Sequence, residues 1–271
     1  MDAKPSHWRL AADTVARLYL PPKDLQIASF DWQGLPTESI SRSYINETAK
    51  PIIWIHGGGF AFGSPRTHRA AAAALSKATH RPVWLPDYPL SPEHPYPAAI
   101  DALNQIQHEA PLDIIGDSAG GNLALSWAIR RQNQDRVILL SPWLDLRVNA
   151  SSAQINAKAH SAFDREDLRE YASLYLAGHP PTASDCSPLL AQDEHIQSLH
   201  SIYLESSKAE LLHSDSIAFA QRCKQLGHAL THHIESDAHH GWQLFPDLLP
   251  EAKRSIQRMQ SFLADNPRGS T

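Results

Sequence analysis

A serine stands between two glycines in the five residues 116–120, Gly-Asp-Ser-Ala-Gly. A mostly apolar run at 112–115 precedes them and a helix-like segment at 122–128 follows, so the pattern predicts a strand, a sharp turn and a helix. A serine on such a turn exposes its hydroxyl at a helix N-terminus, where backbone N–H groups face a developing negative charge. The pattern therefore predicts that Ser118 is a catalytic nucleophile.

A second segment with a possible catalytic role is His-Gly-Gly-Gly-Phe at 56–60, which directly follows an apolar run at 52–55. Backbone amides in such a glycine-rich loop can bind the oxyanion that forms when a serine attacks a carbonyl carbon. Gly-x-Ser-x-Gly alone occurs by chance. Together with this loop, however, it is the signature of the α/β-hydrolase fold, and the two segments predict that fold.

A serine hydroxyl needs a histidine base, and the base needs a carboxylate to orient it. In α/β-hydrolases the acid and then the histidine follow the serine along the chain. The loop after the last predicted strand holds two candidates for the base, His239 and His240. The loop after the preceding strand holds two candidates for the acid, Glu210 and Asp215, and Asp215 could instead cap the following helix or lie in its first turn.

Short apolar runs alternate with amphipathic segments from residue 51 onward, after a predicted hairpin whose turn is at 33–36. This alternation predicts an α/β fold with a mainly parallel central sheet and helices on both faces. We expect six strands, at 52–55, 83–86, 112–116, 137–140, 202–205 and 232–235. We expect helices at about 66–79, 95–109, 119–131, 214–227 and 250–264.

Two segments do not fit this alternation. The first 22 residues include an amphipathic stretch from Trp8 to Leu20, and residues 145–190 contain helical pieces but no strand. An insertion of that length is not expected to be a bare loop. We therefore expect residues 1–271 to form a single domain in which segments 1–22 and about 145–190 make a small helical lid.

Composition excludes several other classes of protein. The net charge of −5 argues against a nucleic-acid-binding surface. No apolar stretch approaches the roughly 20 residues that a membrane span needs, and the start of the chain has no secretory signal pattern. The two cysteines, Cys186 and Cys223, fit reduced thiols better than a disulfide framework. We expect a cytoplasmic protein with no membrane or nucleic-acid partner.

The chain resembles the bacterial hormone-sensitive-lipase-like carboxylesterases, also called family IV lipolytic enzymes, over roughly residues 25–264. The matching segments are the glycine-rich loop at 56–60, the proline-rich segment at 87–99, Gly-Asp-Ser-Ala-Gly-Gly-Asn at 116–122, Ser-Pro-Trp at 141–143 and His-Gly-Trp at 240–242.

The resemblance implies roles for particular residues. It implies that His240 is the base and that Glu210, which precedes it by 30 positions, occupies the family's acid position. It also implies that the amides of Gly58, Gly59 and Ala119 form the oxyanion hole. In this family the exposed final strand, here near residues 231–235, often mediates homodimers.

These observations predict a serine carboxylesterase that hydrolyses small or short-acyl esters through an acyl-enzyme intermediate. Every catalytic group is a side chain or a backbone amide, so no metal or organic cofactor is expected. Aromatic residues near the motifs, Phe60 and Trp143 above all, are candidates for binding the substrate, with Phe163 and Tyr171 as further ones. An acyltransferase, a lactonase, an amidase or a non-catalytic ligand-binding protein of the same fold remain alternatives.

Overall fold

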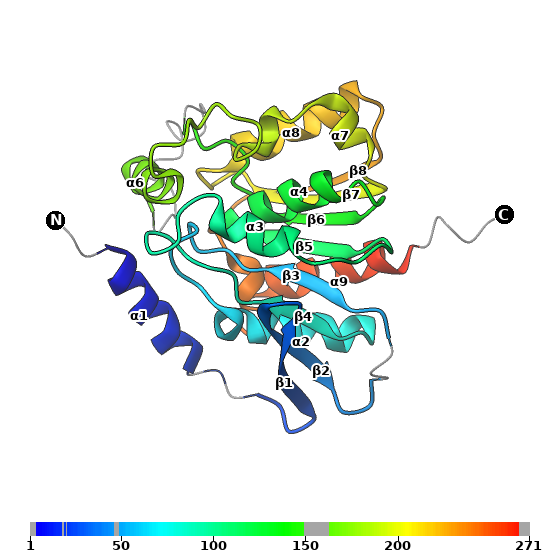
Figure 1. The fold of residues 1–271 in the computed structure, drawn as a ribbon. Coiled ribbons are helices and arrows are strands. Elements are labelled where there is room, and N and C mark those ends of the chain that lie inside the picture. The colour runs from blue at the N-terminus through cyan, green and yellow to red at the C-terminus, as the bar shows by residue number, and fades with distance from the viewer. Residues whose placement is uncertain (1–3, 18, 20, 46–48, 149–162, 266–271) are drawn as a thin grey trace.

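The computed structural model describes the chain apart from residues 1–3, 18, 20, 46–48, 149–162 and 266–271 (Figure 1). One sheet carries strands in the order β1-β2-β4-β3-β5-β6-β7-β8. The hairpin of β1 and β2 and the pairing of β2 with β4 are antiparallel, and all pairs from β4 to β8 are parallel. The predicted mainly parallel sheet is confirmed. Its strands are β1 (Leu25–Trp32), β2 (Leu35–Arg42), β3 (Ile52–Ile55), β4 (Val83–Pro86), β5 (Asp113–Asp117), β6 (Arg136–Leu140), β7 (Ser201–Ser207) and β8 (Leu230–Glu235).

The central strands are apolar on both faces because helices cover both faces. In β3, Ile53 and Ile55 join one hydrophobic cluster, whereas Ile52 and Trp54 join another, as the two-residue period of a strand requires. The first cluster includes side chains of α3 (Ala98–Asn104), α4 (Ala119–Arg131) and α8 (His213–Gln225). The second includes side chains of α2 (Pro65–Thr79) and α9 (Pro250–Ala264). None of the helices in the described part of the chain is long and apolar enough to cross a membrane.

One predicted helix is shorter than expected. The interpretation of residues 95–109 as one helix is wrong, because α3 covers only Ala98–Asn104. Beyond it, the Gln107 amide donates a hydrogen bond to Gln33 Oε1 (2.7 Å), and Gln33 Nε2 donates one to the Gln107 carbonyl (3.0 Å). Gln33 lies in the turn between β1 and β2, so a contact with a distant turn replaces the helical hydrogen bonds.

The two segments expected to form a lid lie to the same side of the sheet, at the left of Figure 1. The first contains α1 (Lys4–Arg17). The second contains α6 (Arg165–Leu176) and the short helix η1 (Pro188–Leu190), and its residues 149–162 lie outside the described residues. The remaining helices are α7 (Asp193–Gln197) and η2 (Trp242–Leu244). The lid that we expect from α1 and α6 stays a prediction at this point and is considered below.

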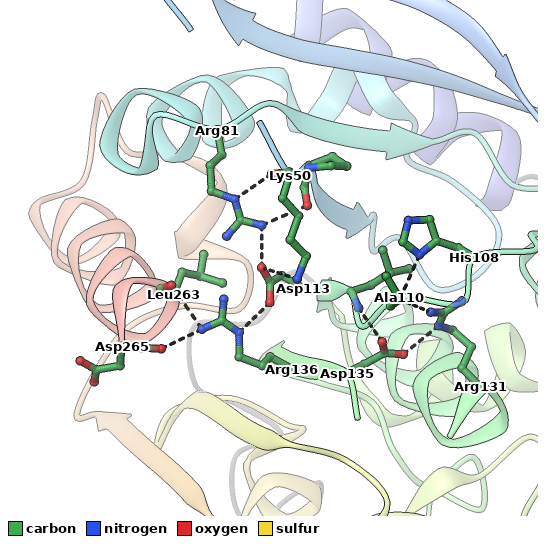
Figure 2. Close-up of polar contacts among 12 residues, drawn as sticks. Lys50, Arg81, His108, Ala110, Asp113, Arg131, Asp135, Arg136, Leu263 and Asp265 are labelled. Carbon is green, nitrogen blue, oxygen red and sulfur yellow. Dashed lines mark hydrogen bonds and ion pairs between the residues drawn. The ribbon is translucent and has the colours of Figure 1, made fainter. Parts of the chain in front are cut away.

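A buried carboxylate joins several elements at the N-terminal end of β5 (Figure 2). Asp113, at the start of β5, is 1% exposed and contacts Arg136 Nε (2.6 Å), Arg81 Nη2 (2.5 Å) and Lys50 Nζ (3.3 Å). Arg136 also donates hydrogen bonds to two carbonyls at the C-terminal end of α9. Burial opposes ionisation of Asp113, but these cations outweigh it and lower its pKa to about 2.

Replacing this carboxylate by an amide, Asp113→Asn, is expected to lower the free energy of unfolding at pH 7 by on the order of 3–5 kcal/mol, because the buried Arg136 and the half-buried Arg81 lose their counter-charge. The folded-state pKa lies below the ordinary value of 3.8, so this stabilisation is present above about pH 4 and is lost as the pH falls toward 2. Denaturant titrations of the wild type and the variant across this range measure it. The control is Asp101→Asn, which changes an exposed carboxylate. If the difference in the free energy of unfolding between Asp113→Asn and the wild type did not depend on pH, the stabilising role of the charged Asp113 would be contradicted.

Candidate active site

Ser118 stands on a sharp turn between β5 and α4. Its backbone has φ 53° and ψ −122°, its amide donates to the Leu140 carbonyl (3.0 Å), and its carbonyl accepts from the Trp143 amide (2.9 Å). Gly120 permits this close packing, because a Cβ atom there would lie 2.2 Å from the Ile55 carbonyl oxygen. The turn thus projects Ser118 from the carboxyl edge of the sheet at the start of α4, as the motif predicted.

Three predicted catalytic side chains form a hydrogen-bonded chain. His240 Nε2 lies 3.0 Å from Ser118 Oγ, and His240 Nδ1 lies 2.9 Å from Glu210 Oε2. Glu210 is 1% exposed, and its other oxygen accepts from the Ser207 amide (2.8 Å). Because a carboxylate can only accept, Nδ1 carries the proton and Nε2 is left to accept one from the serine. This tautomer is the one that a general base requires.

Asp215, the other candidate acid, is engaged elsewhere. It lies in the first turn of α8, but the helix begins after Leu212, and its carboxylate does not cap that helix. One oxygen instead accepts from the amides of Leu144 (2.9 Å) and Asp145 (3.0 Å), in the loop that follows β6. Burial, with the nearby charge of Asp145, raises the pKa of Asp215 to about 7. Its expected place in the first turn of the helix is confirmed, whereas the capping contact considered for it is wrong, and its carboxylate instead connects that loop to α8.

The glycine-rich loop brings backbone amides to Ser118. Gly58 and Gly59 line the same cavity as Ser118 and have positive φ angles, and within the described residues their amides donate no hydrogen bond. Ala119 begins α4, so its amide has no carbonyl partner within the helix. His56, before the loop, stacks on Tyr88, whose hydroxyl donates to the His56 carbonyl (2.7 Å). Burial lowers the pKa of His56 to about 3, so this ring is neutral.

A cavity of about 350 Å³ opens at Ser118 and His240, and most of its lining is apolar. Three of the four aromatic side chains considered from the sequence line it, namely Trp143, Phe163 and Tyr171. Phe60 does not line it, which corrects the prediction of a substrate contact there. Its ring is 1% exposed and stacks on Tyr175, with 3.8 Å between the ring centroids.

Sequence reasoning missed several lining residues. Phe62 lies two positions beyond Phe60 and faces the cavity in its place, in contact with Trp8 and Phe163. Trp8 comes from α1, whose amphipathic pattern signals a buried face but not which part of the molecule buries it. The cavity is also lined by His68 and Asp117, whose contacts are considered below.

Comparisons with known proteins identify the family of this chain. A family model described as an alpha/beta hydrolase fold matches residues 52–244. The chain is 31% identical to an esterase from Acinetobacter venetianus, covering 97% of this chain and 89% of that protein. It is 29% identical to an acetyl-hydrolase from Streptomyces hygroscopicus, covering 80% and 76%.

Solved structures are similar over nearly the whole chain. The crystal structure of an esterase from the bacterial hormone-sensitive lipase family has a TM-score of 0.88 and 29% identity, covering 97% of this chain and 92% of that one. The structure of EstE5 soaked with p-nitrophenyl butyrate has a TM-score of 0.86 and 29% identity, covering 97% and 91%. On these grounds the chain belongs to the hormone-sensitive-lipase-like carboxylic ester hydrolases of the α/β-hydrolase fold.

Proposed function

We propose that this carboxylic ester hydrolase acts through an acyl-enzyme intermediate on Ser118. The observation that carries the proposal is the chain of hydrogen bonds from Ser118 through His240 to Glu210. Ser118 and His240 also line an apolar cavity that can hold the substrate. His240 Nε2 takes the proton from Ser118 Oγ as the oxygen attacks the ester carbonyl carbon. Glu210 then stabilises the imidazolium that forms, as in other serine hydrolases.

The negative charge that develops on the carbonyl oxygen requires hydrogen-bond donors. The amides of Gly58, Gly59 and Ala119 are the proposed donors, since they belong to the loop and the helix start beside Ser118. Collapse of the tetrahedral intermediate releases the alcohol, to which His240 returns the proton. Water, activated by the same imidazole, then attacks the acyl-enzyme and releases the acid.

The cavity supports a preference for small esters. Its volume of about 350 Å³ is near the lower end of the range for small-molecule sites, which is about 300–1,000 Å³. Bulky rings of Trp143, Phe163 and Tyr171 limit its extent, and its apolar lining favours an alkyl or aryl group over a charged one. We therefore propose short-acyl carboxylic esters as the substrates.

Two measurements test the proposal against its alternatives. The first is the rate of hydrolysis of p-nitrophenyl esters of increasing acyl length, with EDTA present, where short chains are expected to be fastest. The second offers the enzyme amides, lactones and competing alcohol acceptors, which separates amidase, lactonase and acyltransferase activity from simple hydrolysis. A protein that fails to hydrolyse any ester and does not react with a fluorophosphonate probe would be a non-catalytic member of the fold.

We further propose that α1 and α6 form a lid over this cavity. Trp8 of α1 packs against Phe163, which precedes α6, with 4.9 Å between the ring centroids, and both rings line the cavity. Arg9 connects the same helix to the residues after the glycine-rich loop and to the proline-rich segment. It donates to the carbonyls of Ala61 (2.6 Å) and Ser91 (2.7 Å) and pairs with Glu93 (2.6 Å).

Releasing this contact by Arg9→Ala is expected to raise KM for p-nitrophenyl butyrate severalfold while kcat changes by less than about threefold, because lid contacts bind substrate without touching the reacting atoms. Deleting residues 1–22 should have the same effect to a greater degree and should alter the chain-length preference. Arg17→Ala, which removes an exposed pair with Asp13 on the same helix, is the control. A truncated protein that fails to fold would show that the segment belongs to the core.

Two further proposals concern assembly and location. β8 is an edge strand that pairs with β7 alone within the sheet, so its outer edge is available for a second copy of the chain. We propose a homodimer through this edge, tested by light scattering of the wild type and of Thr231→Pro.

A cytoplasmic location is supported by two free, buried cysteines, Cys186 and Cys223, and cell fractionation tests it.

A further inference from the structure

A buried polar cluster lies directly behind the glycine-rich loop. At its centre is Asp117, the residue before Ser118, which is 5% exposed. Both of its carboxylate oxygens lie 3.1 Å from the Gly57 amide, and Oδ1 also accepts from Trp54 Nε1 (2.9 Å). A Cβ atom at Gly57 would lie 2.3 Å from Asp117 Oδ2, so this approach requires glycine. Asp117 thus joins the serine turn to the residue that precedes Gly58 and Gly59.

His68, on α2, holds this carboxylate from the other side. Its ring is 2% exposed, and Nε2 lies 3.0 Å from Asp117 Oδ1. Because a carboxylate can only accept, His68 Nε2 is the donor. Its other nitrogen, Nδ1, lies 2.8 Å from the hydroxyl of Thr67, which is itself bonded to the backbone of Ser64. The ring is therefore fixed at both nitrogens and cannot turn away from Asp117 without breaking two hydrogen bonds.

The electrostatics of the cluster keep Asp117 charged. Burial opposes ionisation of this carboxyl group, but the facing His68 and the hydrogen bonds from His68 and Trp54 outweigh it, so its pKa lies below the ordinary value. A charged acceptor makes stronger hydrogen bonds than a neutral one, and it therefore holds the Gly57 amide more firmly. The neighbouring His56 ring, whose pKa is lowered by burial, is neutral.

We propose that His68 is a positioning residue of the ester hydrolase, which acts through Asp117 to hold the glycine-rich loop in register with Ser118. The inference rests on the proposed function, in which amides of this loop bind the oxyanion. Oxyanion donors are effective only when they are fixed in place before the charge develops. Among the described residues, His68 makes no hydrogen bond with Ser118 or His240, although its side chain also lines the cavity. Its hydrogen bond to Asp117 is what connects it to the glycine-rich loop.

This position predicts which kinetic constant changes. A displaced oxyanion donor weakens binding of the transition state more than binding of the ester, so kcat falls while KM changes little. Removing the ring by His68→Leu is expected to lower kcat about 10- to 100-fold, less than the loss of an oxyanion donor itself. The affinity for an alkyl trifluoromethyl ketone, which forms a tetrahedral oxyanion adduct, should fall in parallel.

A conservative variant and a matched control separate positioning from packing. His68→Gln can place an amide N–H near the position of imidazole Nε2 and is expected to recover most of kcat. Leu75→Ala truncates another fully buried side chain of α2 that has no part in the cluster. Leu75→Ala is expected to lower the denaturation midpoint without changing kcat by more than about threefold. The reason is that the molecules that remain folded keep the glycine-rich loop in place.

The decisive test is a double-mutant cycle with Asp117→Asn, with kcat and KM for p-nitrophenyl butyrate as the readouts. If His68 acts through Asp117, the effect of His68→Leu is smaller in the Asp117→Asn background than in the wild type. Additive effects, an unchanged kcat in His68→Leu, or an equal loss in Leu75→Ala would overturn the inference. An inactive wild type would instead overturn the proposed function, so the two failures are distinguishable.

Discussion

Ser118→Ala is expected to lower kcat for p-nitrophenyl butyrate by on the order of 10⁴ or more, because no other hydroxyl is bonded to His240 Nε2 in the described part of the chain. The side chain of Ser118 makes one hydrogen bond, to His240, whereas its backbone holds the turn through Leu140 and Trp143. Alanine keeps those backbone contacts. The denaturation midpoint should therefore stay close to that of the wild type.

Labelling with a fluorophosphonate probe gives an independent measurement, since only an activated serine reacts with it. The variant should not be labelled, and the wild type should be labelled once per chain. Ser126→Ala is a matched control on the helix that follows Ser118, because the Ser126 hydroxyl is buried and has no hydrogen-bond partner among the described residues. A Ser118→Ala protein that keeps more than about a hundredth of the wild-type kcat would contradict the covalent mechanism.

The features that could be predicted from the sequence are those that depend on the pattern of residues within one short segment of the chain. The helix after Ser118 has its expected bounds, Ala119–Arg131, because the elbow motif fixes its start and its apolar pattern continues to two arginines. The inner strands β3, β5 and β6 are short apolar runs, which stand out because both of their faces are buried. The geometry of Ser118 with His240 and Glu210 also agrees with the chain order that the fold imposes.

The cavity walls could not be predicted in the same way, because they come from contacts between distant segments. Phe60 and Phe62 are both aromatic and close to the loop, and only the path of the backbone, with φ 62° at Phe60, decides which ring faces the cavity. Asp117 occupies the variable position of the Gly-x-Ser-x-Gly pattern. Its contact with Gly57 becomes visible only when β3 and β5 are side by side.

Glu210→Gln is expected to lower kcat by on the order of 10⁴, although the variant is nearly isosteric. The amide oxygen can still accept from the Ser207 amide, so the loop after β7 keeps its contact. The amide nitrogen then faces His240 Nδ1, which must accept instead of donate. The ring proton moves to Nε2, and the imidazole can no longer accept the proton of Ser118. The denaturation midpoint should change little.

Asp215→Asn is the matched variant, because Asp215 is the other buried acid of the same segment. Its oxygen accepts from the amides of Leu144 and Asp145, and an asparagine oxygen can accept both hydrogen bonds. We therefore expect kcat within about threefold of the wild type and a change in the free energy of unfolding of about 1 kcal/mol at most near pH 4. Activity should thus separate the two acids clearly.

The pH dependence of stability distinguishes them further. The folded-state pKa of Asp215, about 7, lies above its ordinary value of 3.8, so the folded protein holds this proton more tightly than the unfolded chain does. Asp215 therefore costs stability increasingly as the pH rises from about 4 to 7, and Asp215→Asn should gain stability relative to the wild type over that range. Denaturant titrations at pH 4, 5.5 and 7 measure this trend. If Asp215→Asn is inactive while Glu210→Gln is as active as the wild type, Asp215 and not Glu210 is the acid of the triad. The reason is that loss of the residue that orients His240 lowers kcat and leaves the protein folded.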